Sequence, residues 1–188
     1  MTAGTSQLVL AMVGTDHHPF DRLVDWMDEW AQDQPHGAVR VVVQHGRTHA
    51  PRAAESRDFI PRRELDALIA EASVVVCHGG PSTIVETRRR GLSPIVLARS
   101  TRLGEHVDDH QQRFARAMSD RGLIRLVTGQ ADLTQAVDEA LVNPLLVDKS
   151  VVDDPGQSAL RLGRLVEELI ARPSTPRWSL RRDRQPTG

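Results

Sequence analysis

The stretch Val74-Val75-Val76-Cys77-His78-Gly79-Gly80-Pro81-Ser82-Thr83 decides the fold, because it connects an apolar strand to a helix through a sharp turn. The two glycines allow the turn and let a ligand approach the main chain, and Pro81 suits the first turn of a helix. Free N–H groups at that helix start form a binding site for an anion such as a diphosphate. The turn could also be a plain connection, because Thr83 and Glu86 have the spacing of a capping box.

Apolar, β-branched runs repeat on both sides of this stretch, with helical patterns between them. The runs cover residues 8–13, 39–43, 74–77 and 94–97 and, more weakly, 124–127, and the helical patterns cover about 19–32, 65–69, 82–90, 109–121 and 131–142. Continuous apolar strands that alternate with helices predict an α/β fold, a Rossmann-like doubly wound parallel sheet. Ligands bind such sheets beyond the carboxyl ends of the strands, near the switch in strand order. The loops to consider are therefore residues 14–19, 44–51, 78–82 and 98–109.

Length and composition indicate one domain with a tail. The 188 residues carry a formal net charge of −1 and 39% hydrophobic residues, which argues against disorder and against a nucleic-acid-binding role. We expect the domain to cover residues 1–171, with a last helix at 157–171. Residues 172–188 carry five arginines against one acidic residue and predict a basic tail, either flexible or a docking segment for a partner or an anionic membrane.

Cysteine usage and the amino-terminal segment indicate a cytoplasmic protein. Cys77 is the only cysteine, so it forms no internal disulfide, and its apolar neighbours predict a small buried thiol. The first apolar run, residues 8–13, is too short for a signal peptide or a membrane span. We therefore expect a soluble or peripheral protein.

Several polar residues downstream of the turn have side chains suited to a nucleoside or a sugar. One turn inside the helix, Glu86 can accept hydrogen bonds from both vicinal hydroxyls of a ribose, a role that competes with helix capping. Gln111 and Gln112 can donate to and accept from sugar hydroxyls, although paired surface glutamines are common. Asp108 and Asp109 precede them and could bind a ligand or cap a helix.

His17 and His18 lie in the loop after the first strand. A neutral imidazole there could hydrogen-bond a phosphate or act as a base, or the pair could be ordinary loop polarity. No metal site is expected, because the HExxH arrangement is absent from both histidine pairs spaced four residues apart, His45/His49 and His106/His110.

Together these features resemble the C-terminal, donor-binding domain of family 28 glycosyltransferases, which is one half of a GT-B fold. The resemblance covers about residues 8–142 and rests on Val13-Gly14-Thr15, Pro19-Phe20-Asp21-Arg22-Leu23, Gln44-His45-Gly46, His78 to Thr83 with Glu86 and Gly91, and Asp109-His110-Gln111-Gln112. Because no domain precedes the first strand, the chain is similar to stand-alone donor subunits. These are the donor subunit of the eukaryotic dolichol-linked N-acetylglucosaminyltransferase and those of the bacterial exopolysaccharide two-component glycosyltransferases, and the opening of the chain resembles the bacterial branch more.

The resemblance implies roles for individual residues. The donor would be bound by Gly14, Thr15, His78, Gly79, Gly80, Ser82, Thr83, Glu86, Asp109, Gln111 and Gln112. Within this set, Gly79-Gly80 and Ser82-Thr83 would hold the diphosphate, Glu86 the ribose, and the glutamine pair the sugar. Two features depart from the family pattern. Pro81 stands where the family often has a small flexible residue, and His17-His18 extends the first loop.

The resemblance also implies a reaction and a partner. The chain would be the catalytic donor-binding subunit that moves a sugar from a UDP-sugar to a lipid-linked acceptor hydroxyl in polysaccharide or glycoconjugate synthesis, without a metal or other cofactor. The base would come from the other half, so no catalytic residue is assigned here, with His17 and His18 as candidates. We expect a membrane-associated acceptor-binding subunit, which would place the chain at the inner face of the cell membrane. A homo-oligomer stays open, as do two other functions, a sugar-nucleotide epimerase and a non-catalytic nucleotide-sugar-binding protein.

Overall fold

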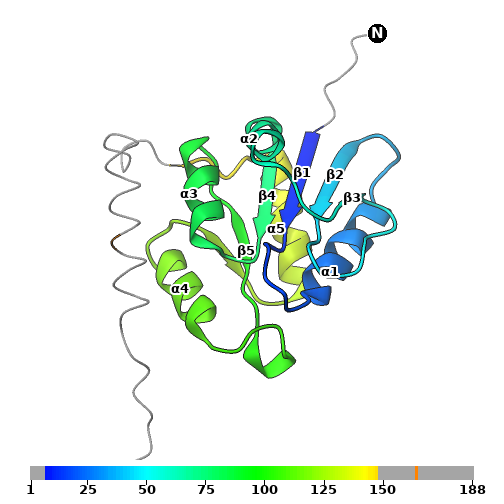
Figure 1. Cartoon of the computed structure of the whole chain (residues 1–188). Helices are drawn as coiled ribbons and strands as arrows, with labels where there is room; N and C mark the ends of the chain where they lie inside the picture. Colours follow the sequence, from blue (N-terminus) through cyan, green and yellow to red (C-terminus); the bar gives the residue numbers. More distant parts are fainter. Residues whose placement is uncertain (1–6, 148–163, 165–188) are drawn as a thin grey trace, which may run out of the picture.

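A single parallel sheet organises the molecule (Figure 1), a computed structural model that describes residues 7–147 and residue 164. Its six strands lie in the order β3-β2-β1-β4-β5-β6, and every neighbouring pair is parallel. The strands are β1 (Gln7–Met12), β2 (Val39–Gln44), β3 (Glu55–Arg57), β4 (Val74–Cys77), β5 (Ile95–Leu97) and β6 (Arg125–Val127). The chain runs outward from β1 to one edge and then returns to β4, so the switch in strand order lies between β1 and β4. The predicted doubly wound α/β fold is confirmed.

Helices cover both faces of the sheet. They are α1 (Asp21–Gln32), α2 (Arg62–Glu71), α3 (Pro81–Arg89), α4 (His110–Ser119) and α5 (Gln130–Val142), with a short 3₁₀ turn η1 (Thr101–Leu103) before α4. In Figure 1, α1 and α5 pack on one side and α2, α3 and α4 on the other. Trp30 of α1 donates a hydrogen bond from its indole to Asp138 of α5 at 2.9 Å, which joins the two helices on their face.

Strand β1 shows why the sequence of the central strands is continuously apolar. Its side chains alternate between the two cores: Val9 and Ala11 pack with α1 and α5, whereas Leu8 and Leu10 pack with α2, α3 and α4. All four are buried. A strand covered on both faces has no solvent side on which polar residues would be favoured, so the pattern of alternation is lost.

The structure differs from the sequence prediction in one strand. Strand β3 was not predicted, because it is short, polar and partly exposed, and it pairs only with β2 at the edge of the sheet. The predicted helix at 157–171 and the basic tail at 172–188 lie outside the described residues. Within residues 7–147, no helix combines the length and the apolar character needed to cross a bilayer.

Candidate functional site

The loops that follow β1 and β4 meet at the switch in strand order, with the His78 ring between them. Gly14 has a φ of 84°, and a Cβ atom on it would lie 2.6 Å from Cε1 of His78. A Cβ atom on Gly80 would lie 2.7 Å from Nε2 of the same ring. The imidazole therefore occupies the space that both glycines leave free. Three of the predicted donor-binding residues are thus brought into contact from segments more than sixty residues apart.

The loop after β2 joins the same place through the buried amide of Gln44, a residue of the family motif to which the sequence interpretation assigned no role. Gln44 accepts a hydrogen bond from the Gly14 main-chain N–H at 3.1 Å and donates to the carbonyls of Gly14 and Asp58 at 3.0 and 2.9 Å. A Cβ atom on Gly46 would lie 2.8 Å from the Gly14 carbonyl oxygen. The sequence did contain a sign of this role, since Gln44 ends an otherwise apolar strand. A polar side chain buried there needs hydrogen-bond partners from neighbouring loops.

Helix α3 begins beside the His78 ring with its first N–H groups free. Gly80 is the N-cap residue, Pro81 opens the helix, and no side chain caps it. The N–H groups of Ser82 and Thr83 therefore lack intrahelical partners and point beyond the carboxyl edge of the sheet. The capping-box alternative for Thr83 and Glu86 is wrong, because the N-cap residue is Gly80, three residues before Thr83.

Glu86 faces α2 instead of the helix start. One of its carboxylate oxygens accepts a hydrogen bond from Arg62, whose Nε also lies 3.0 Å from the Asp66 carboxylate. These residues border an open cleft of about 300 Å³ between α2 and α3, lined by Arg62, Asp66, Ile69, Glu86, Arg89 and Arg90. A surface ion pair is weak, so a ribose hydroxyl could replace Arg62 at this carboxylate at little expense in free energy.

Arg99 holds the loop after β5 against the loop after β1. Its side chain is 1% exposed, and its guanidinium donates to four main-chain carbonyls at 2.8–3.2 Å, those of Val13, His18, Pro19 and Glu105. Its carbon Cζ lies 4.7 Å from the centre of the Phe20 ring. Burial lowers the pKa of Arg99, and the Asp16 and Glu105 carboxylates act in the opposite direction. A buried arginine in a predicted loop cannot be told from a surface one by sequence, so this residue was missed.

The predicted sugar-binding residues lie at the start of α4. Gln112 donates from its amide to the Arg99 carbonyl at 3.1 Å, so one of its two N–H donors supports the loop. The buried Oε1 of Gln111 has no partner among the described residues. Asp109 is the N-cap residue of α4, but its side chain accepts a hydrogen bond from the Thr101 hydroxyl at 2.6 Å and none from the helix. Gln111 is therefore the member of this group with the most unused capacity.

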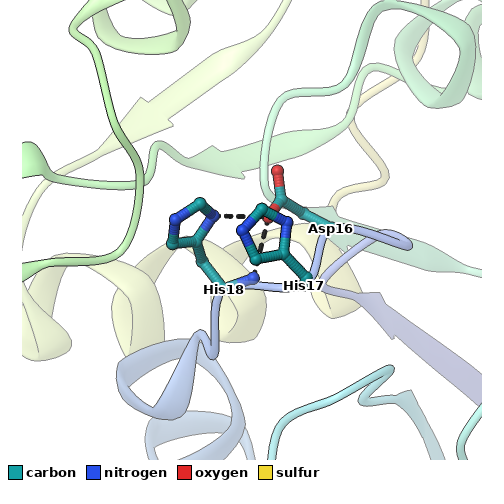
Figure 2. A group of neighbouring side chains, drawn as sticks. All are labelled: Asp16, His17 and His18. Atoms are coloured by element: carbon teal, nitrogen blue, oxygen red, sulfur yellow. Dashed lines mark hydrogen bonds and ion pairs between the residues drawn. The ribbon is translucent and has the colours of Figure 1, made fainter.

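Asp16 and His18 form a hydrogen-bonded pair in the loop after β1 (Figure 2). One Asp16 oxygen accepts the His18 main-chain N–H at 2.8 Å and lies 2.7 Å from His18 Nδ1. Burial acts to raise the pKa of Asp16, but these hydrogen bonds and the Arg99 charge lower it to about 2. The ligand atoms of Asp16, His17 and His18 lie within 4.8 Å of one another. We interpret the group as a carboxylate–imidazole pair and not as a metal site, because the shared oxygen is already occupied by two hydrogen bonds.

One protein family matches nearly all of the described chain. The model of the glycosyltransferase family 28 C-terminal domain covers residues 8–150. The chain belongs to this family. The Rossmann-like sheet described above is accordingly one half of a GT-B fold, and the resemblance stated from the sequence is confirmed.

A curated relative of the family 28 domain comes from Pseudomonas aeruginosa. It is the UDP-N-acetylglucosamine--N-acetylmuramyl-(pentapeptide) pyrophosphoryl-undecaprenol N-acetylglucosamine transferase, which is 31% identical over 120 residues. The alignment covers 56% of this chain and 32% of that protein. The chain therefore spans about a third of the length of the curated relatives it matches.

Solved structures share the fold of the family 28 domain. The NMR structure of ALG13 matches with a TM-score of 0.54 at 16% identity and covers 86% of this chain and 97% of that one. The glycotransferase of kitacinnamycin matches with a TM-score of 0.56 at 23% identity, covering 91% of this chain and 41% of that one. At these identities the likeness establishes the fold alone.

His78 makes the stability of the family 28 domain depend on pH. Burial lowers the pKa of its ring to about 4, and the Arg99 charge acts in the same direction. In the unfolded chain the ring titrates near 6.5, so between these values the unfolded state binds the proton and the folded state does not. We expect the free energy of unfolding to fall by up to about 3 kcal/mol between about pH 7 and pH 4. Urea unfolding of the wild type and of His78→Gln across this range measures it, and parallel profiles would contradict the expectation.

Proposed function

We propose that this chain binds a UDP-sugar at the switch in strand order. It transfers the sugar to a hydroxyl of a lipid-linked acceptor in polysaccharide or glycoconjugate synthesis. The observation that carries the proposal is the contact of His78 with Gly14 and Gly80 beside the free N–H groups of α3. This geometry holds the turn against the loop after β1 and leaves the uncapped start of α3 open to a diphosphate. The donor and acceptor classes follow those of the curated relatives, which by name use a UDP-linked sugar and a polyprenol-linked acceptor.

The rate contribution of this half would come from stabilising the leaving diphosphate. As the bond between the sugar and the diphosphate breaks, negative charge grows on the phosphate oxygens. Main-chain N–H groups of the Gly79-Gly80 turn and of Ser82 and Thr83 are fixed by the fold before the reaction, so they need no reorganisation. We infer that the reaction needs no metal ion for this purpose. Undiminished transfer in the presence of a chelator is the expected result.

The other predicted residues would bind the rest of the donor. The Glu86 carboxylate would exchange its hydrogen bond from Arg62 for hydrogen bonds from both ribose hydroxyls. This requires only that an exposed ion pair opens. The unpartnered Oε1 of Gln111 and the free oxygen of Gln112 would accept hydrogen bonds from sugar hydroxyls. Gly14, Thr15 and Asp109 border the same edge of the sheet.

An acceptor-binding partner would face this edge. Phe59 after β3, and Leu103 and Val107 after β5, are large apolar side chains that are exposed in loops beyond the carboxyl ends of the strands. Exposed large apolar side chains at the edge of the sheet that would bind the donor can form part of an interaction surface. We propose that they contact a membrane-associated acceptor subunit, which would hold the chain at the cytoplasmic face of the membrane.

The purified chain alone is expected to bind the donor but to transfer little sugar, because the acceptor would be positioned by the partner. Calorimetric titration with UDP, GDP and dTDP measures the first part, with UDP expected to bind most tightly. A transfer assay with and without the partner subunit measures the second. Robust transfer by the chain without a partner would contradict the two-component proposal, and conversion of a UDP-sugar without any acceptor would favour an epimerase.

Replacing Glu86 tests the donor site directly. Glu86→Ala is expected to weaken UDP binding by about tenfold to a hundredfold, because two charge-assisted hydrogen bonds to the ribose would be lost. The matched control is Glu71→Ala, which removes an exposed carboxylate paired with Arg40 at the far end of α2. Transfer in the reconstituted pair should be abolished by the first change and unaffected by the second. If Glu86→Ala weakened UDP binding but even the wild-type pair transferred no sugar, the result would favour a non-catalytic nucleotide-sugar-binding protein.

A further inference from the structure

The loop after β1 contains the chemistry of a general base, although the family resemblance assigns the base to the other half. We propose that His18, oriented by Asp16, accepts the proton of the acceptor hydroxyl during transfer. This inference rests on the proposed function and adds a catalytic residue to it. It would leave the partner subunit the task of binding the acceptor.

Hydrogen bonding fixes the His18 ring in the orientation that a base needs. The Asp16 carboxylate can only accept, so the neutral ring carries its proton on Nδ1, at 2.7 Å, and keeps a lone pair on Nε2. The second hydrogen bond, from the His18 main-chain N–H, locks the carboxylate to the same residue. The low pKa of Asp16 keeps it ionised at neutral pH, so it can stabilise the imidazolium that proton transfer creates.

The position of the pair is fixed relative to the diphosphate turn. His18 follows Gly14 by four residues, and Gly14 contacts the His78 ring of that turn. The His18 carbonyl accepts a hydrogen bond from buried Arg99 at 2.8 Å, which prevents the loop from moving away. The His18 side chain is 22% exposed, so part of it is open to solvent.

His17 lacks these properties. Its side chain is 80% exposed, and its Nδ1 lies 3.5 Å from the Asp16 oxygen that already accepts from His18. The groups that face the His18 ring are Asp16, His17 with ring centres 3.9 Å apart, and His106 with ring centres 5.9 Å apart, while the Arg99 guanidinium contacts its main chain. His106 also lies 3.6 Å from the second Asp16 oxygen and so helps to hold the carboxylate.

The reaction then balances within the complex. The acceptor oxygen forms a bond to the anomeric carbon of the sugar as its proton passes to Nε2 of His18. The bond from that carbon to the β-phosphate oxygen breaks, and its electron pair leaves with the diphosphate. His18 afterwards releases the proton to water, which regenerates the neutral base.

The test uses the full chain with its acceptor subunit, a UDP-sugar and the acceptor. His18→Ala is expected to lower kcat by a hundredfold or more, with UDP affinity by calorimetry unchanged within about twofold. Asp16→Asn should lower kcat at an unchanged KM for the donor, a split that a merely structural role would not produce. Added imidazole should restore part of the activity of His18→Ala. The matched control is His49→Ala, which removes another imidazole bonded to a carboxylate, that of Asp25 at 2.8 Å on the surface.

Each other outcome decides against the assignment. Transfer by His18→Ala at the wild-type rate overturns it while the proposed function stands. An equal loss in His17→Ala, or a parallel loss of UDP affinity in His18→Ala, also overturns it. Failure of the wild-type pair to transfer sugar at all would remove the proposed function itself, and this inference with it.

Discussion

Gly14→Ala is expected to lower the free energy of unfolding by about 3 kcal/mol or more and to weaken UDP binding at least tenfold. Two effects add. An alanine at a φ of 84° is strained by about 1–2 kcal/mol, because its Cβ approaches the following carbonyl. That Cβ would also lie 2.6 Å from Cε1 of the His78 ring, which packs almost as closely against Gly80 of the turn. The ring must therefore displace the turn that would bind the diphosphate.

Gly91→Ala is the matched control. Gly91 has a φ of 86°, almost that of Gly14, but a Cβ on it would meet nothing within 4 Å. Gly91→Ala should lower the free energy of unfolding only by the backbone strain and leave UDP binding unchanged. In the double variant Gly14→Ala/His78→Ala the clash is gone. Its loss in the free energy of unfolding should therefore be smaller than the sum of the losses of the two single variants. Urea unfolding of the wild type, the three single variants Gly14→Ala, Gly91→Ala and His78→Ala, and the double variant provides the comparison. Equal losses for Gly14→Ala and Gly91→Ala would mean that the contact with His78 is unimportant.

The sequence was informative where one local pattern determined the structure. Residues 74–77 were predicted as a buried strand because four consecutive apolar residues precede a glycine turn, and they form β4. Pro81 was placed in the first helical turn because its fixed backbone angle suits that position, and it opens α3. The same holds for α1, where Leu23, Val24 and Met27 recur on one face and are buried.

The sequence was uninformative where contacts join distant segments. Nothing near Arg99 in the sequence reveals that it donates to the carbonyls of Val13 and His18, more than eighty residues away. Glu86 illustrates the opposite error, because its spacing from Thr83 suggested a local capping contact, whereas its partner is Arg62 on another helix. Strand β3 was missed because only its pairing with β2 defines it.

Arg99→Met is expected to lower the free energy of unfolding by about 3–5 kcal/mol. Methionine fills a similar space beside Phe20 but donates no hydrogen bond, so four main-chain carbonyls lose their donor. Arg22, 2.8 Å from the Glu105 carboxylate, would then hold the loop after β5 without the help of Arg99. Because the carbonyls belong to the loops after β1 and β5, amide hydrogen exchange at residues 14–19 should become faster.

The control for this change is Arg102→Met, since Arg102 is an exposed arginine three residues along the same loop. A surface substitution of this kind should change stability by no more than about 0.5 kcal/mol. Chemical denaturation of the two variants at neutral pH provides the comparison. If Arg99→Met were as stable as Arg102→Met, the four carbonyls would have to find other donors, and Arg99 would not be what fixes the loop that carries Asp16 and His18. The expected result is a large loss in the free energy of unfolding for Arg99→Met alone, together with fast amide exchange that neither salt nor UDP slows. The loop and the catalytic geometry would then depend on this one buried charge.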